Sequence, residues 1–427
     1  MFKQILIVYI GLFLLIHTNM MATPLEDSTG TNQRWQNTVK PYLDEPLWTT
    51  QLSYNAGHFL MVPMHAAFDL NKVEWQQDFA KHFERFADTG YNDMGKTLLY
   101  RIHYLYLASQ FLVLCQETHA DSLIPPRLYD ILFEKINKTW NQDEIWQWKY
   151  AGRKSATFKN MRSKVLWKLY NPDMNEKIYY RSIMDDELFT MAIAADLKRY
   201  LYLKSLPPNN VLDDMTQMAV EVFQQRAQWN SDGGWLLQPG YWSQYEDFAY
   251  AGNDSVHDSL QRKEVKNIAE DVSHSLRLPL WICSFQKSME TVGPNYTFFS
   301  QLKKGLEIQL FKTILVLPTE QNPYYLAHNF MDGHNGVYRY HYNNRPGGSG
   351  PYELSAHLCL GWWSFLGSER TQSMYKFFDK NDPFAASNGV AYYRKVIDPK
   401  GHLVKNIQTH EMCQLIATLA ASLPLAK

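Results

Sequence analysis

Apolar residues recur at intervals of three and four along almost the whole chain, the spacing that places them on one face of an α-helix. Asn71 and Gly90 are suited to the start and the end of the first such segment, and Pro125 opens a later one. Strand-like alternation is clearest at residues 336–342, which are expected to form a short hairpin arm or an extended loop. The pattern therefore predicts an all-α protein. The expected helices lie at about residues 71–88, 94–117, 125–140, 175–204, 211–229, 263–289, 297–316, 353–366 and 405–423.

Short connections between helices of this length favour antiparallel packing of sequential neighbours. Segments of roughly 45 to 60 residues each hold about two helices, as in repeat architectures, without a shared consensus sequence. No low-complexity linker separates Leu47 from Leu423. We expect residues 23–427 to form a single domain of sequential antiparallel helix pairs. Three irregular stretches, residues 140–163, 230–256 and 318–351, are candidates for functional loops.

The N-terminus has the pattern of a targeting segment. Lys3 supplies a short positive region, residues 5–16 are apolar, and Ala22 is a small residue at a cleavage position. This predicts a signal peptide over residues 1–22 and an exported protein, periplasmic or extracellular, with an uncleaved signal anchor as the alternative. The apolar run is shorter than the roughly 20 residues of a membrane span. No later run resembles one, so no span is expected in the mature chain.

Charge and aromatic content narrow the class of partner. The formal net charge is -1, so there is no basic field to attract nucleic acid. Aromatic residues make up 15% of the chain, with 27 Tyr and 13 Trp. Such side chains stack on sugar rings at partly wet clefts, and they also fill gaps between helices. The composition leaves both roles open.

The four cysteines, Cys115, Cys283, Cys359 and Cys413, are widely separated and lie in apolar helical stretches. No pair has the spacing of a zinc or redox motif, so buried thiols are expected. One or two disulfides are open after export, and the sequence does not assign them. Neither a metal nor a cofactor is predicted.

Two clusters of polar residues interrupt apolar segments. In the first, Glu270 and His274 are four residues apart on one predicted helix face, and Asp271 is three residues from His274. A carboxylate beside an imidazole fixes its tautomer and raises its pKa, as a general acid or base requires. In the second cluster, Glu353 and His357 repeat the spacing of Glu270 and His274. A helix start with acidic residues and one hydrogen-bonded histidine is the structural alternative for the first cluster.

The loops around these clusters carry candidate binding groups. Asn344 and Arg345 precede the second cluster in a glycine-rich loop, where Arg345 is placed to clamp a carboxylate. His334 and Tyr338 lie between the clusters, without the ligand spacing of a metal site. Further aromatic candidates for a sugar subsite are Tyr241 and Trp242.

The helix-pair organisation, the run Asp185-Asp186-Glu187-Leu188 leading into residues 192–196, and the helix start at residues 269–274 carry a resemblance. The chain resembles the helical (α/α) toroid enzymes, which include polysaccharide lyases, several glycoside hydrolases and uronate epimerases. The resemblance implies a complete or incomplete toroid in which inner helix ends and their preceding loops line a central cleft.

Two mechanisms follow from this resemblance. In a lyase, Tyr241 or His274 would remove the proton beside a uronate carboxylate that Asn344 and Arg345 neutralise. In a hydrolase, paired carboxyl groups would act as acid and as base or nucleophile. The expected function is an exported enzyme that cleaves or modifies a polysaccharide, with uronate polymers among the candidates. The hydrolase candidates are Glu270, Asp271 and Glu353, and the expected substrate-binding residues are Trp242, His334, Tyr338, Asn344, Arg345 and His357.

The alternative class is a non-catalytic helical-repeat protein of the cell envelope that binds a ligand or acts as a scaffold. Stacked helix pairs form the extended concave surfaces that such proteins use. The two classes differ in one structural expectation. An enzyme brings Glu270, His274, Arg345 and Glu353 into one cleft, whereas a scaffold leaves the clusters apart on the outer surface.

Overall fold

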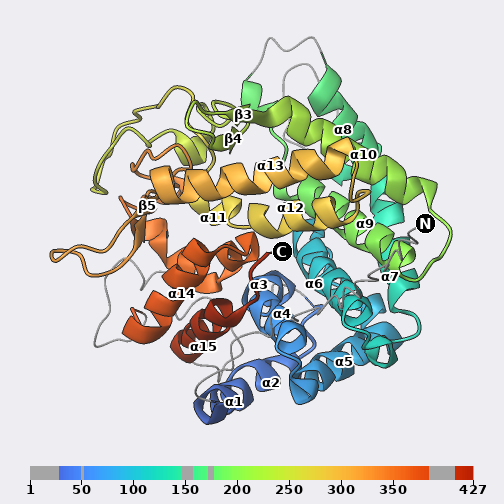
Figure 1. Cartoon of the computed structure of the whole chain (residues 1–427). Helices are drawn as coiled ribbons and strands as arrows, with labels where there is room; N and C mark the ends of the chain where they lie inside the picture. Colours follow the sequence, from blue (N-terminus) through green and yellow to red (C-terminus); the bar gives the residue numbers. More distant parts are fainter. Residues whose placement is uncertain (1–27, 50–51, 147–156, 172–176, 384–408, 427) are drawn as a thin grey trace, which may run out of the picture.

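The computed structural model describes residues 28–49, 52–146, 157–171, 177–383 and 409–426, and helices dominate it (Figure 1). The predicted signal peptide lies outside these residues. The strands described form three two-stranded pairs, and none is longer than three residues. The all-α class is therefore confirmed.

The α-helices are α1 (Ser28–Asn37), α2 (Val39–Leu43), α3 (Leu52–Phe59), α4 (Met61–Asp69), α5 (Val73–Asp88), α6 (Leu98–Glu117), α7 (Leu128–Asn141), α8 (Met161–Tyr170), α9 (Asp185–Leu203), α10 (Asn210–Arg226), α11 (Val272–Ser275), α12 (Leu278–Lys287), α13 (Pro294–Gln309), α14 (Glu369–Asn381) and α15 (Thr409–Ser422). The strands are β1 (Ile145–Trp146), β2 (Thr157–Phe158), β3 (Ala227–Trp229), β4 (Trp235–Leu237), β5 (Leu315–Val316) and β6 (Leu326–Ala327). Short 3₁₀ helices relevant to the site are η4 (Glu246–Phe248), η7 (Glu353–Leu360) and η8 (Trp362–Leu366).

Seven of the helices expected from apolar spacing are present, most of them within a few residues of their predicted ends, but α9 begins ten residues after its predicted start and α13 ends seven residues before its predicted end. The seven are α5, α6, α7, α9, α10, α13 and α15. The N-terminal helices α1 to α4, and the helices α8 and α14, were not predicted. Helix α4 has apolar residues on every side and is buried almost throughout, so it lacks the one-sided pattern on which the prediction rests.

Two predicted helices differ from the structure at the polar clusters. Residues 263–271 are not helical, and the helix begins only after Asp271, whose side chain caps it. Residues 353–366 form two 3₁₀ helices instead of one α-helix. They are separated by Gly361, whose φ is +79°. At three residues per turn, Glu353 and His357 no longer share a face.

The segment expected to be a hairpin arm or an extended loop is a loop. Gly336 approaches the backbone so closely that a Cβ atom built there would lie 1.5 Å from the Ala251 carbonyl oxygen. Tyr338 forms an isolated bridge with Ser349. The contact with Ala251 holds residues 336–342 against the loop at residues 230–256. The bridge to Ser349 fixes the position of Tyr338.

The helices pack in a defined order. Helix α3 packs on α6, α6 on α9, α9 on α12, and α12 on η8. Helix α15 packs on η7 and on α4. Helix α5 lies against α4, and both α7 and α10 lie against α9. Helix α13 lies against α12, and α14 lies beside α15 (Figure 1). One continuous cluster of buried apolar side chains extends from Trp35 to Leu423.

Much of the unusual aromatic content fills this core. Six of the Trp residues that the structure describes are fully buried, so they take the packing role that the composition left open. The six are Trp35, Trp140, Trp235, Trp281, Trp362 and Trp363.

Helix α6 is the one described helix that is long and apolar enough to cross a membrane. In this fold it contacts α3, α7 and α9, and 78% of its most apolar 18-residue window is buried within the protein. Its apolar character is therefore accounted for by packing against these helices.

Candidate functional site

Two adjoining cavities lie where α6, α9 and α11 begin. The first has a volume of about 830 Å³ and is lined by the first turns of α6 and α9 and by residues that precede α11. The second has a volume of about 600 Å³ and is lined by α3, η7 and the loop that contains Arg345. His274 and Arg339 line both cavities. The two spaces therefore meet at these side chains.

His274 is held in one orientation by Asp271. The Asp271 carboxylate caps α11 by accepting hydrogen bonds from the backbone N–H groups of Ser273 and His274, at 3.0 and 3.2 Å. Its other oxygen lies 2.7 Å from Nδ1 of His274. An ionised carboxylate only accepts, so Nδ1 carries the proton, and Nε2 is the nitrogen left for other chemistry. The contact predicted between residues 271 and 274 is confirmed.

Asp271 and its neighbour Glu270 are driven to opposite protonation states. Burial alone would raise the pKa of Asp271, but contact with His274 and hydrogen bonds from His274 and Ser273 hold that pKa well below its usual range. Burial, followed by the nearby charges of Asp185 and Asp271, raises the pKa of Glu270 well above its usual value. The pKa values of these adjacent carboxyl groups are therefore shifted in opposite directions, the kind of division that separates an acid from an ionised carboxylate in acid–base catalysis.

Arg277, which immediately precedes α12, is 1% exposed and contacts residues of α3 and α9. Its guanidinium forms an ion pair with Asp185 in the first turn of α9 and donates to the Tyr54 hydroxyl at 3.0 Å. Its Nε donates to Nε2 of His58 at 3.1 Å, and His58 Nδ1 donates to the Tyr54 carbonyl at 2.9 Å. Burial and then the charge of Arg277 lower the pKa of His58, which keeps its ring neutral.

Arg339 and Tyr338 form the boundary between the cavities. Arg339 Nε donates to Asp247 of η4 at 3.0 Å, and the guanidinium lies 4.3 Å from the centre of the Tyr342 ring. The hydroxyl of Tyr338 is 3.4 Å from His274 Nδ1. The backbone of Arg339 has a φ of +61°, a left-handed conformation that residues other than glycine rarely adopt. These contacts keep a cationic group beside His274.

Eight of the eleven predicted site residues line the two cavities. Glu270, Asp271, His274, Trp242 and Tyr338 line the first, while Arg345, Glu353 and His357 line the second together with His274.

Three predicted residues lie outside both cavities. The Tyr241 hydroxyl contacts Arg226, whose guanidinium lies over its ring, and His334 Nε2 is 2.7 Å from the Ala251 carbonyl oxygen. Asn344 ends an exposed 3₁₀ turn with a φ of +58°. Each is positioned by its own loop, away from His274.

Several site residues were missed in the sequence. Arg277, Asp185, Tyr54, His58 and Arg339 come from segments far apart in the chain, and no local motif links them. Only Asp185 could have been found from the sequence, because it is the first residue of the run that carries the resemblance to toroid enzymes.

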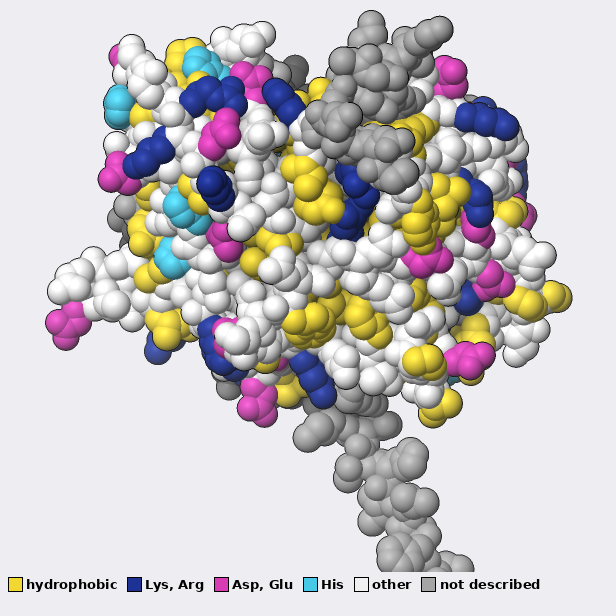
Figure 2. Space-filling model, turned by 90° about the horizontal axis from the view of Figure 1, so that it is seen from above, with side chains coloured by type: hydrophobic (Ala, Val, Ile, Leu, Met, Phe, Trp, Pro, Cys, Tyr) yellow, Lys and Arg dark blue, Asp and Glu magenta, His cyan; other side chains and the backbone are white. Residues whose placement is uncertain are grey.

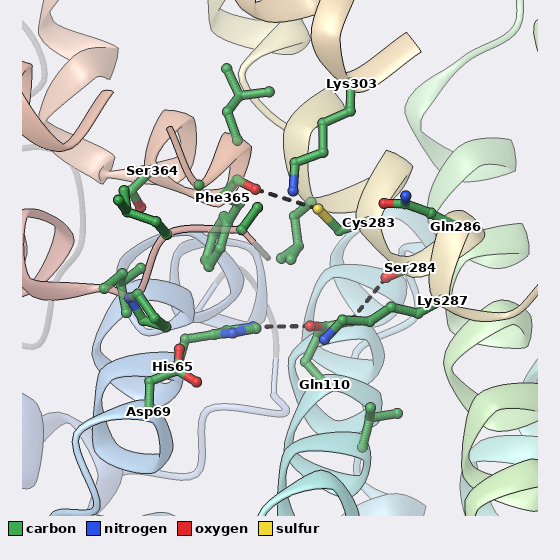
Figure 3. A pocket seen from close by; sticks show the side chains of 18 of the residues that line it. His65, Asp69, Gln110, Cys283, Ser284, Gln286, Lys287, Lys303, Ser364 and Phe365 are labelled. Atoms are coloured by element: carbon green, nitrogen blue, oxygen red, sulfur yellow. Dashed lines mark hydrogen bonds between the residues drawn. The ribbon is translucent and has the colours of Figure 1, made fainter. Parts of the chain in front are cut away.

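A third cavity, of about 640 Å³, is lined by residues of α4, α12, α13 and η8 and of the C-terminal halves of α6 and α9 (Figure 3). Gln110 of α6 donates to Asp196 of α9 at 2.8 Å and to Ser284 of α12 at 2.9 Å. His65 Nε2 lies 2.9 Å from Oε1 of Gln110, and Ser109 donates to Asp196 at 2.6 Å. This network largely satisfies its own donors and acceptors and joins four helices, so we assign it a structural role.

The buried ionisable groups predict how stability depends on pH. Burial is the main cause that lowers the pKa of five histidines, so the unfolded chain takes up protons below about pH 6.5 that the folded protein excludes. These histidines stabilise the fold above that pH, and their contribution is lost on acidification. They are His58, His65, His82, His103 and His357.

Four carboxyl groups with raised pKa values act in the opposite direction and offset part of this loss. Because the histidines outnumber them, the free energy of unfolding should still fall as the pH is lowered from 6 to 5. Denaturant titration at several pH values measures this slope. Asp196→Asn removes one opposing group, with a pKa of about 7, and should steepen it. A flat or inverted slope would contradict the assignment. The four groups are Asp69, Asp196, Asp247 and Glu270.

Among the described residues, no group of three His, Cys, Asp or Glu side chains is arranged to hold a metal ion. Charged side chains of both signs are intermixed with apolar ones on the face shown in Figure 2. The chain matches no family model, no curated protein and no solved structure.

Proposed function

We propose that this protein is an exported glycoside hydrolase of the helical toroid type, which cleaves a polysaccharide at the junction of the two cavities. The observation that carries the proposal is the pair Glu270 and Asp271, which line one cavity beside a histidine anchored at 2.7 Å and whose pKa values are shifted in opposite directions. The order of helix packing, from α3 through α6, α9 and α12 to α15 and α4, supports a toroid. The cavities lie at the ends of these helices, where such folds carry their sites.

In the proposed reaction, Glu270 donates its proton to the oxygen of the glycosidic bond as that bond breaks. His274 takes a proton from the attacking water through Nε2, and Asp271 stabilises the imidazolium that forms. The oxygen of the water joins the sugar carbon, so one water molecule is added across the bond. The charge of Asp185 raises the pKa of Glu270, whereas the charge of Arg277, with which Asp185 forms an ion pair, lowers it.

The charge of the first cavity favours hydrolysis of a neutral sugar there over lyase chemistry on a uronate. Seven carboxyl groups and four cationic side chains line it, but the pKa of Glu270 is raised, and Asp185 and Asp186 pair with Arg277 and Lys164 outside the lining. The other carboxylates equal the cations in number, so the cavity has no surplus positive charge to bind a uronate carboxylate. Arg339 and Arg345 make the second cavity the better position for an acidic sugar. The carboxyl groups belong to Asp143, Glu144, Asp185, Asp186, Asp247, Glu270 and Asp271, and the cations to Lys96, Arg101, Lys138 and Arg339.

The binding-protein alternative predicts that the polar clusters lie apart on the outer surface. Glu270 and His274 instead share one cavity, and His274 shares the second with Arg345 and Glu353. This arrangement supports an enzyme.

The test is incubation of the purified protein, produced from the full-length sequence, with a panel of neutral and acidic polysaccharides. Both new reducing ends and the ultraviolet absorbance of unsaturated products are measured. We expect reducing ends to rise without absorbance. A rise in both would replace the hydrolase with a lyase, and silence in both across the panel would favour the binding protein.

A further inference from the structure

Two of the four cysteines meet in the core. Cys359 belongs to η7 and Cys413 to α15, and they are 54 residues apart in the sequence. Their sulfur atoms are 3.3 Å apart, and the two residues are 2% and 0% exposed. The other two cysteines have different surroundings, since Cys115 is buried in α6 and the Cys283 sulfur contacts the Phe365 carbonyl oxygen at 3.4 Å.

We infer that Cys359 and Cys413 form a disulfide bond that joins the C-terminal helix to the wall of the second cavity. A separation of 3.3 Å exceeds the length of a disulfide, about 2.05 Å, by little more than 1 Å. Small side-chain rotations cover such a distance. The sequence left the pairing of the four cysteines open, and the fold brings this pair together.

The bond forms by exchange with a low-molecular-weight disulfide such as oxidised glutathione. One cysteine thiolate attacks that disulfide and releases one glutathione thiol, and the second cysteine then attacks the mixed disulfide and releases another. Two thiols are oxidised, one glutathione disulfide is reduced, and two protons pass from the cysteines to the released thiols.

Burial limits when this exchange takes place. Burial raises the pKa of the Cys359 thiol, so little thiolate is present once the protein has folded. The bond is therefore expected to form during folding and to resist reductant in the native state. This describes a structural crosslink and not a reversible switch.

The crosslink has a consequence for the proposed site. Glu353 and His357 of η7 and Thr409 of α15 line the second cavity. A bond between residues 359 and 413 fixes these two walls relative to each other. This consequence rests on the proposed function, whereas the existence of the bond does not.

The experiment counts free thiols after denaturation of protein refolded with reduced and oxidised glutathione. The wild type should show two free thiols. Cys283→Ser and Cys115→Ser, which leave the pair intact, should each show one. Cys359→Ser and Cys413→Ser should each show three, and peptide mapping should recover the linked pair. Four free thiols in the wild type, or a link between other cysteines, would overturn the inference.

Two further measurements separate the bond from the fold and from catalysis. Reduction under denaturing conditions followed by refolding without oxidant should lower the Tm by about 5 °C, because the bond closes a loop of more than 50 residues. Cys359→Ala provides a second variant if serine in the core prevents folding. In the polysaccharide assay, loss of the bond should raise KM more than it lowers kcat. An unchanged KM with the expected thiol counts would leave the bond established and remove its link to the site.

Discussion

Replacing Glu270 by Gln is expected to lower kcat by about 10²- to 10⁴-fold on the polysaccharide that the wild type cleaves. Glutamine has the same shape and still forms hydrogen bonds, but it cannot give a proton to the leaving oxygen. Burial and the neighbouring carboxylates raise the pKa of Glu270, so the substitution is expected to change the charge of the site little. Substrate binding should therefore change little, and KM should stay within about threefold of the wild-type value.

The pH profile gives a second readout for the same variant. The wild type needs Glu270 protonated, so its rate should fall as the pH rises through the raised pKa of Glu270. Glu270→Gln should retain only a low rate without that alkaline limb. Glu264→Gln is the matched control, because Glu264 lies in an exposed ion pair with Arg262 and lines neither cavity.

His274→Gln tests the partner role. It should lower kcat to a similar extent, since glutamine accepts no proton from water at neutral pH. Circular dichroism and the Tm show whether each variant is folded. If a folded Glu270→Gln or His274→Gln variant retained more than a third of the wild-type kcat, the proposed roles of these residues would be refuted.

Replacing Glu187 by Gln is expected to destabilise the fold by about 3 to 5 kcal/mol, or to lower the Tm by about 4 to 6 °C. The Glu187 carboxylate has no exposed surface and lies 3.0 Å from Lys164 and 2.5 Å from Lys168, both of which are also fully buried. Its second oxygen accepts from the Met184 backbone N–H at 2.7 Å and so caps α9. Without this charge, only Asp186 remains beside the two ammonium groups, at 2.9 Å from Lys164.

The pH dependence of this variant follows from Lys168. Burial lowers the pKa of Lys168 to about 8, even though the charge of Glu187 raises it. Glu187→Gln should lower that pKa further. An amine with a lowered pKa in the folded state binds fewer protons than in the unfolded chain, so stability rises with pH. The variant should therefore recover part of its lost stability between about pH 7 and pH 10.

Glu264→Gln again serves as the control, here for stability. It makes the same chemical change in an exposed ion pair with a separation of 3.0 Å, where the expected cost is below about 1 kcal/mol. Denaturant unfolding followed by circular dichroism measures both variants. Equal losses in the two would show that the buried ion pairs contribute nothing beyond what an exposed pair contributes.

Local regularities in the sequence determined the helical class and the contact between Asp271 and His274. Apolar residues three and four positions apart bury one face of a helix whatever it packs against, so helices such as α5, α6 and α10 were predictable. The contact between Asp271 and His274 was predictable too, because it spans three residues and forms within one turn. The resemblance to toroid enzymes led to the same helix start.

Tertiary structure decided where these elements meet and which charges share a space. Arg277 pairs with Asp185 across 92 residues of sequence, and Arg339 pairs with Asp247 across another 92. The spacing of apolar residues carries no information on such ion pairs. They stabilise the fold only after the segments that carry them have packed together and excluded water.

The α-helix predicted at residues 353–366 was wrong for the same reason, because its conformation depends on non-local packing. Its apolar spacing suits an α-helix, yet Gly361 turns the chain into a left-handed conformation and the segment folds as two 3₁₀ helices packed on α15 and α12. The contact between Cys359 and Cys413 depends on that packing. Sequence alone thus determined the class of fold and one catalytic candidate pair, while non-local packing set the cavities, the buried ion pairs and the protonation state of Glu270.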